Sequence, residues 1–171
     1  MPVSILSELF ELERIEKSLG MILANECGVQ IQTRWTTVVD ETPRIELVYR
    51  TGSPVGRYNG YAGQNSFGPA QPFNAWSYEL DASIITTRTG PDAAQHVPLI
   101  GKVRWLLNYR TLCGYPGHPS PLTEEISPYH TITSCDEVAQ LDSVDDENSL
   151  QIAKITFRGI INIRDSAWPP A

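Results

Sequence analysis

The stretch that decides the fold is Ile155-Thr-Phe-Arg-Gly-Ile-Ile-Asn-Ile-Arg-Asp-Ser-Ala-Trp-Pro-Pro-Ala171. Its alternating pattern predicts a β-strand, because successive side chains of a strand point to opposite faces. One predicted face holds four apolar side chains: Ile155, Phe157, Ile161 and Ile163. Pro169 and Pro170 cannot donate to a sheet, so the strand must end before a tail at residues 165–171. We therefore expect Trp168 in that tail to contact a neighbouring chain, and the alternative is that it folds back over the edge of its own sheet.

The composition indicates one domain over residues 1–171. A chain of 171 residues with 41% hydrophobic side chains is long enough to form one hydrophobic core and short for two domains. A net charge of −7 without a run of Lys or Arg argues against a protein that binds nucleic acid through its phosphates. An acidic protein could still line a channel through which DNA passes. The first residues interleave acids with apolar groups, which predicts neither a signal peptide nor a membrane span. Three widely spaced cysteines favour reduced thiols in a cytosolic setting: Cys27, Cys113 and Cys135.

Two segments have the periodicity of amphipathic helices. The first covers residues 4–25, with Gly28 as a plausible stop. The second opens near Gly90 and runs to about Leu112, so Pro98 must lie in its first turn or kink it. The apolar stripes expected to face a sheet are Ile5, Leu9, Leu12, Ile15, Leu19 and Ile22 in the first helix and Val97, Ile100, Val103, Leu106 and Leu107 in the second.

Alternation predicts five strands, and the first two form a hairpin or meander. Their expected ranges are 29–39, 44–50, 73–89, 129–134 and 150–164. Residues 51–72 are rich in Gly, Pro and Tyr and predict a long loop, while residues 136–148 are acidic and aperiodic and predict a solvated one. The order of elements indicates an α+β single domain with a mostly antiparallel or mixed sheet of about five strands and both helices packed on it.

Two clusters have residue types that can bind metals. Cys113, His118, His130 and Cys135 could supply two thiolates and two imidazoles, but their spacing is loose and His130 and Cys135 are expected on opposite faces of a strand. The acids of residues 142–147 lack the glycine of a calcium loop. We therefore expect no metal and no cofactor.

A few polar residues could carry other chemistry. His96 lies four residues after Asp92 and could act as a base, but the sequence has no recognisable nucleophile elbow or phosphate loop. We expect His96 to form a capping or interface hydrogen bond. Arg88 and Arg104 could contact phosphates, yet isolated arginines more often pair with carboxylates such as Asp81 or Asp92. The sequence thus predicts no catalytic residue.

Three segments together carry a resemblance to a known family. They are an N-terminal amphipathic helix leading into a meander, the strand end Ile84-Ile-Thr-Thr-Arg-Thr89 followed by the helix with His96, and the terminal Phe157-Arg-Gly-Ile-Ile-Asn-Ile-Arg-Asp-Ser-Ala-Trp-Pro169. With this pattern, which spans most of the chain, the protein resembles the tail terminator or tail-completion proteins that close the tail tube of tailed bacteriophages.

The resemblance implies a virion structural protein, assembled in the host cytoplasm, that is not an enzyme. Such a protein forms a ring, usually a hexamer, on the end of the tail tube, stops tube polymerisation and joins the head-side connector or neck protein. DNA would pass through the ring without sequence-specific binding, and no membrane is involved. The residues expected at interfaces are Arg57, Tyr58, Tyr61, Phe67, Arg88, His96 and Trp168.

Two alternatives remain open. The chain could be another neck or head-completion adaptor of the virion, which the sequence does not separate from a terminator. It could instead be a small-ligand-binding or enzymatic domain in which the loop at residues 51–72 is a lid. Against this second alternative, Arg57 is the only charged residue in that loop.

Overall fold

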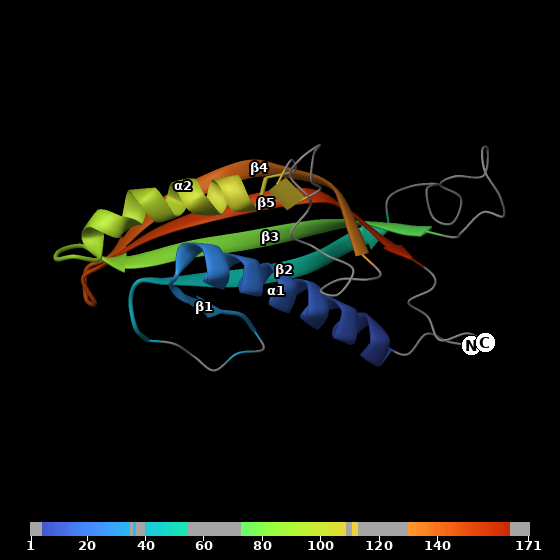
Figure 1. Cartoon of the computed structure of the whole chain (residues 1–171), viewed down its shortest axis with the longest axis horizontal. Coiled ribbons are helices and arrows are strands. Elements are labelled where there is room, and N and C mark those ends of the chain that lie inside the picture. Colours follow the sequence, from blue (N-terminus) through green and yellow to red (C-terminus); the bar gives the residue numbers. More distant parts are fainter. Residues whose placement is uncertain are drawn as a thin grey trace.

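The computed structural model describes residues 5–34, 36, 40–54, 73–108, 111–112 and 130–164. Its elements are α1 (Ile5–Cys27), β1 (Gln30–Gln32), β2 (Arg44–Pro54), β3 (Phe73–Thr87), the short 3-10 helix η2 (Ala93–Gln95), α2 (His96–Leu106), β4 (His130–Asp145) and β5 (Leu150–Arg164). Within these residues, five strands form one sheet in the order β1-β2-β3-β5-β4, and both helices lie against the same face (Figure 1). The predicted α+β class with a mixed sheet and two packed helices is confirmed.

The two longest predicted strands form the centre of the sheet. β3 and β5 pair in antiparallel fashion from Phe73↔Arg164 to Thr87↔Leu150. The bounds predicted for β5, residues 150–164, are confirmed, and β3 ends at Thr87, two residues before the predicted end. Ile155, Phe157 and Ile161 are buried, as their alternation predicted.

The prediction of a hairpin between residues 29–39 and 44–50 is wrong. β1 has only three residues, and it pairs parallel to β2 in the register Gln30↔Arg44. The strand stops because Thr33 and Thr36 form a local turn. The Thr33 N–H donates to Thr36 Oγ1 over 2.8 Å, and the Thr36 N–H donates to the Thr33 carbonyl over 3.3 Å. Such side-chain bonds to nearby backbone compete with sheet pairing.

The prediction of a solvated loop at residues 136–148 is also wrong. β4 continues to Asp145 and pairs with β5 in antiparallel fashion down to Asp145↔Leu150. Its register shifts between Glu137 and Ala139, where Val138 is an extra residue and forms a β-bulge. A tight turn then joins the strands, and Ser149 takes a positive φ of 55° in it. The free edge of β5 offered hydrogen bonds that the composition of this segment did not reveal.

The predicted loop at residues 51–72 begins later than expected. β2 continues through Thr51 to Pro54, with an irregularity in its pairing to β3 between these two residues. The rest of the predicted loop, residues 55–72, lies outside the described part of the chain, as does the tail at residues 165–171.

The predicted stripe of α1 is confirmed where its side chains are described: Leu19 and Ile22 are buried. The side chains of the other four stripe residues lie outside the described part of the chain: Ile5, Leu9, Leu12 and Ile15.

α1 ends before Gly28, which has a φ of 65° and donates to the Ala24 carbonyl over 3.0 Å. Pro98 lies in the first turn of α2, which ends at Leu106 and not near Leu112. One stripe position was wrong, because Val97 is 74% exposed and Leu99 is buried in its place. None of the helices in the described residues is long and apolar enough to cross a membrane.

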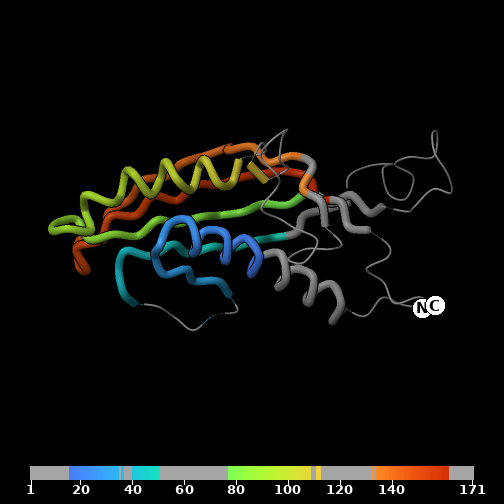
Figure 2. The backbone as a smooth tube through the Cα atoms, in the orientation of Figure 1, coloured from blue at the N-terminus to red at the C-terminus, as the bar shows by residue number. Residues whose placement is uncertain are grey.

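The core lies between the helices and the covered face of the sheet. α1 and α2 contact each other as well as the strands, and Figure 2 shows them lying side by side. The Tyr49 and Tyr78 rings stack with centroids 5.6 Å apart. The largest fully buried side chains are Tyr49, Phe157, Leu19, Leu23, Ile45, Leu47, Leu80, Ile84, Leu107, Leu112 and Ile155. The opposite face of the sheet has no helix over it among the described residues.

Candidate functional site

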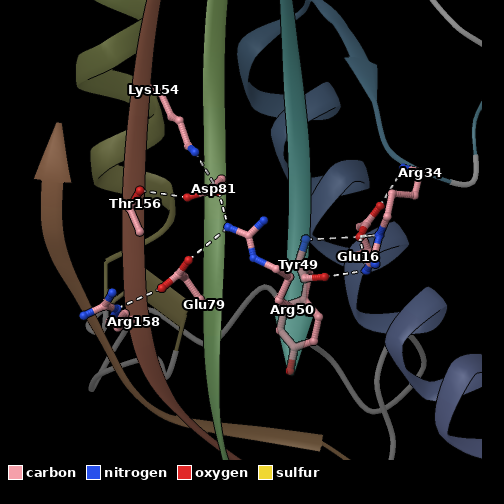
Figure 3. A network of polar contacts seen from close by, with 9 residues as sticks. All are labelled: Glu16, Arg34, Tyr49, Arg50, Glu79, Asp81, Lys154, Thr156 and Arg158. Carbon is pink, nitrogen blue, oxygen red and sulfur yellow. Dashed lines mark hydrogen bonds and ion pairs between the residues drawn. The ribbon is translucent and has the colours of Figure 1, made fainter. Parts of the chain in front are cut away.

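On the β2 side of the sheet, Glu16 of α1 forms an ion pair with Arg34, whose side chain is 41% exposed (Figure 3). Glu16 is fully buried, and its Oε1 accepts the Arg34 backbone N–H over 2.7 Å. Glu16 Oε2 accepts from Arg34 Nε over 3.0 Å and from the Tyr49 backbone N–H over 3.1 Å. Arg34 Nη2 donates in turn to the Tyr49 carbonyl.

This arrangement covers β2 just past the point where β1 stops. The last residue of β2 that β1 pairs with is Glu46, and Tyr49 lies three residues further along. The backbone groups of Tyr49, which a neighbouring strand would otherwise satisfy, bond to a carboxylate and a guanidinium instead. We call this group of Glu16, Arg34 and Tyr49 the β2 edge cap. It removes a place where another strand could pair.

A second group of charges links the three central strands on the uncovered face of the sheet (Figure 3). Arg50 Nη2 contacts Glu79 Oε1 over 2.9 Å and also pairs with Asp81. Arg158 Nε contacts Glu79 Oε2 over 2.9 Å, and Lys154 Nζ contacts Asp81 Oδ2 over 3.1 Å. Each oxygen of Glu79 thus faces one cation, and Asp81 Oδ2 faces two.

The carboxylates of this face are held in their charged form. Burial works to raise the pKa of Asp81, but hydrogen bonds from Thr156, Lys154 and Arg50 outweigh it, so the pKa is lowered. Thr156 Oγ1 donates to Asp81 Oδ1 over 2.7 Å. Hydrogen bonds from Arg158 and Arg50 lower the pKa of Glu79. A charged and fully paired carboxylate is a poor general acid or base, so this group fits a role in holding the strands together.

Two of the predicted interface residues lie in the described part of the chain. Arg88 Nη1 pairs with Asp146 Oδ1 over 2.6 Å, and both side chains are exposed. His96 Nδ1 lies 2.9 Å from Thr86 Oγ1, and burial lowers its pKa against the opposing effect of Asp142. Arg88 and His96 bind different partners and do not form one site. The other five predicted residues, Arg57, Tyr58, Tyr61, Phe67 and Trp168, lie outside the described residues.

Arg104 connects α2 to β4. Its Nε and Nη2 donate to the two carboxylate oxygens of Glu137 over 2.8 and 2.7 Å, and Nη2 also donates to Gln140. The pairing of Arg88 and Arg104 with carboxylates follows the prediction, although the partners are Asp146 and Glu137 and not Asp81 or Asp92.

Two members of the predicted cysteine and histidine set, Cys113 and His118, lie outside the described residues. Cys135 is buried, and its Sγ donates to the Leu107 carbonyl over 2.8 Å. Burial is the main cause that raises the pKa of Cys27. Among the described residues, no group of three or more His, Cys, Asp or Glu side chains could hold a metal ion.

Several large apolar side chains are exposed on α2 and on β4, and Met21 of α1 is exposed by itself. Trp105 is 63% exposed, and it shares the outward side of α2 with Val97 and Gly101, which are spaced four residues apart along the helix. An added Cβ at Gly101 would meet nothing within 4 Å. On β4, the exposed apolar residues are Val138, Leu141 and Val144. These two surfaces are the strongest candidates for contacts with other chains in the described part of the molecule.

Sequence reasoning missed the β2 edge cap and the exposed face of α2. A signal for the first was present, because Glu16 lies four residues after Leu12 and three before Leu19, on the apolar stripe of α1. An acid within such a stripe is either paired in the core or ends the stripe. No local signal identified Arg34 as its partner.

The comparisons with known proteins name no family. No family model matches the chain, and no curated protein matches it. One solved structure, of a protein without a functional name, aligns over 93% of this chain and 94% of its own, with 8% sequence identity and a TM-score of 0.47. We base no inference on that likeness.

Proposed function

We propose that this chain is a virion structural protein of the tail-terminator type. In this proposal it forms a ring, usually of six copies, on the end of a phage tail tube, stops tube polymerisation and offers a surface to the head-side connector. DNA passes through the ring. The proposal rests first on the three sequence segments that resemble this family.

The observation that carries the proposal is the exposed apolar face of α2, formed by Val97, Gly101 and Trp105. Trp is among the residues that contribute most to protein interfaces, and a large exposed Trp beside a glycine allows a partner to approach the helix closely. Rings form when one patch of a subunit binds a different patch of the next subunit. The α2 face supplies one such patch.

The polar groups of the described residues support a structural role over an enzymatic one. Arg50, Glu79, Asp81, Lys154 and Arg158 compensate one another within a network across three strands. Catalytic sites instead bring together titratable groups whose environments leave one of them poised to exchange a proton. The acidic turn region after β4 would repel DNA if it faced the channel of a ring.

The experiment measures molar mass by light scattering over a hundredfold range of protein concentration. We expect a ring-sized oligomer for the parent chain and a shift toward the monomer for Trp105→Ser. The matched control is Glu41→Ser, an exposed change near the opposite edge of the sheet, which should leave the mass unchanged. A monomer at all concentrations would contradict the ring.

The terminator activity is tested by adding the protein to polymerising tail-tube protein and measuring tube lengths by electron microscopy. We expect shorter tubes with one capped end. A ring that leaves the length distribution unchanged would favour another neck or head-completion adaptor.

A further inference from the structure

The outer edge of β4 is an open sheet edge. β4 is the last strand in the sheet order, and Figure 1 shows it at the margin of the sheet farthest from β1. From Asp136 to Val144 its residues are exposed on both faces of the strand. Within the described residues, this stretch has no backbone partner other than β5. On an edge strand, alternate residues direct their N–H and C=O groups outward, where an extended segment can pair with them.

Pairing with a second copy of this chain is disfavoured at both long edges. Two β4 edges would bring the six carboxylates of residues 136–147 on one copy against those of the other, and like charges that face each other across a strand pair are destabilising. The β2 edge is covered at Tyr49 by the edge cap. β1 offers only three residues. Among the described strands of a second copy, neither long edge therefore suits the β4 edge, which favours a segment of a different protein.

Charge selects the kind of segment that fits. Residues 136–147 carry six acids and no Lys or Arg, whereas the rest of the chain holds 14 acids and 13 Lys and Arg. Arg104 pairs with Glu137 and Arg88 with Asp146, which leaves four acids of this stretch without an ion pair to a described residue. They are Asp136, Asp142, Asp145 and Glu147.

Apolar groups on both sides of β4 add a second requirement. Leu141 is 64% exposed and pairs with Lys154, so it lies on the uncovered face, while Val144 is paired with Gln151 on the side of the helices. A strand added beside β4 would place its own side chains next to Leu141 on one face and Val144 on the other. A segment with only basic residues would leave both uncovered.

We propose that the β4 edge from Asp136 to Asp145 binds an extended segment of another protein, rich in Lys or Arg and in β-branched apolar residues, by β-strand addition. The backbone of the segment continues the sheet, its cations face the unpaired acids, and its apolar side chains cover Leu141 and Val144. The site is separate from the α2 face and does not require the ring proposed above.

The first test uses three fluorescent octapeptides and the full chain, with binding followed by anisotropy. One peptide alternates Lys with Val, the second alternates Glu with Val, and the third has the Lys–Val composition with two central prolines that prevent strand pairing. We expect the Lys–Val peptide to bind at least tenfold more tightly than either of the others. Equal binding of the proline peptide would overturn strand addition and leave only charge attraction.

The second test locates the site. Asp136→Lys with Asp142→Lys, both exposed, should weaken binding of the Lys–Val peptide at least tenfold, whereas the matched Asp40→Lys with Glu41→Lys, also exposed, should not. Hydrogen exchange of amides in residues 136–145 should slow when the peptide is added. Unchanged exchange, or equal loss in both double variants, would overturn the proposal.

The third test separates this site from ring formation. The Trp105→Ser variant should bind the Lys–Val peptide as tightly as the parent chain, whatever its molar mass. If the Asp136→Lys, Asp142→Lys variant lacks the oligomeric mass of the parent chain, a second copy occupies this edge, and the proposal of a different partner is wrong.

Discussion

The two long edges of the sheet are built in opposite ways. At β2, a buried Glu16 and Arg34 bond to the backbone of Tyr49 and close the edge. At β4, the strand is exposed from Asp136 to Val144, and its backbone partner within the described residues is β5 alone. Edge strands that stay open risk uncontrolled pairing, which proteins limit with bulges and charges. β4 has both, in Val138 and the acids around it. The β2 edge is thus capped at Tyr49, whereas the β4 edge is open and acidic.

One of the two largest expected effects comes from removing the β2 edge cap with Glu16→Ala. Glu16 is buried, and its removal leaves the backbone N–H of Tyr49 without its acceptor, so we expect the free energy of unfolding to fall by about 2 kcal/mol. Urea denaturation measures this loss. The control is Glu26→Ala, exposed on the same helix, which should change stability by less than about 0.5 kcal/mol. Equal stability of the two variants would show that the cap does not stabilise the fold.

The junction of β4 with the sheet is tested by Gly159→Ala. An added Cβ would lie 1.9 Å from the Ser134 carbonyl oxygen and 2.7 Å from the Tyr78 hydroxyl, which donates to that same oxygen over 2.9 Å. The backbone must move, and we expect a loss of about 2 kcal/mol. Gly101→Ala is the matched control, because its Cβ meets nothing within 4 Å and alanine favours a helix by about 1 kcal/mol. Thermal melting should show opposite shifts for the two variants.

The ion network of Arg50, Glu79, Asp81, Lys154 and Arg158 should make the free energy of unfolding depend on pH in the acidic range. The folded-state pKa of Asp81 is lowered, so its contribution is complete above the unfolded value of about 3.9 and is lost as the pH falls through the folded pKa. We expect Asp81→Asn to cost about 1 kcal/mol at pH 7 and to flatten the decline of the unfolding midpoint below about pH 4. A decline as steep as in the parent chain would contradict this role.

The smallest effect is expected for the pair that joins α2 to β4. Arg104 and Glu137 are part-exposed, and such pairs contribute about 0.5 kcal/mol. A double-mutant cycle with Arg104→Gln and Glu137→Gln should give this coupling in low salt and almost none in about 1 M salt, because screening weakens exposed pairs. A coupling energy above about 2 kcal/mol that does not change with salt would contradict this expectation. It would mean that the pair between Arg104 and Glu137 stabilises the fold as strongly as the β2 edge cap.

The sequence alone determined the elements whose evidence is local. Periodicity identified both helices and the five strand regions, the bounds of β5 were right at both ends, and Gly28 marked the end of α1. These features depend on the alternation or helical spacing of neighbouring residues, which the chain displays directly. The α+β class followed from their order. The role of the tail at residues 165–171 and of residues 55–72 stays a prediction.

Only the tertiary structure decided which strands pair and which side chains are buried. β1 lies parallel to β2, the acidic segment after Cys135 is a strand because β5 lies beside it, and Glu16 is buried because Arg34 and Tyr49 meet it there. Each of these outcomes joins residues that are distant in the chain, so no local pattern contains it. The difference between a closed and an open edge arises from such contacts, since hydrogen bonds between distant segments form only when the whole sheet is assembled.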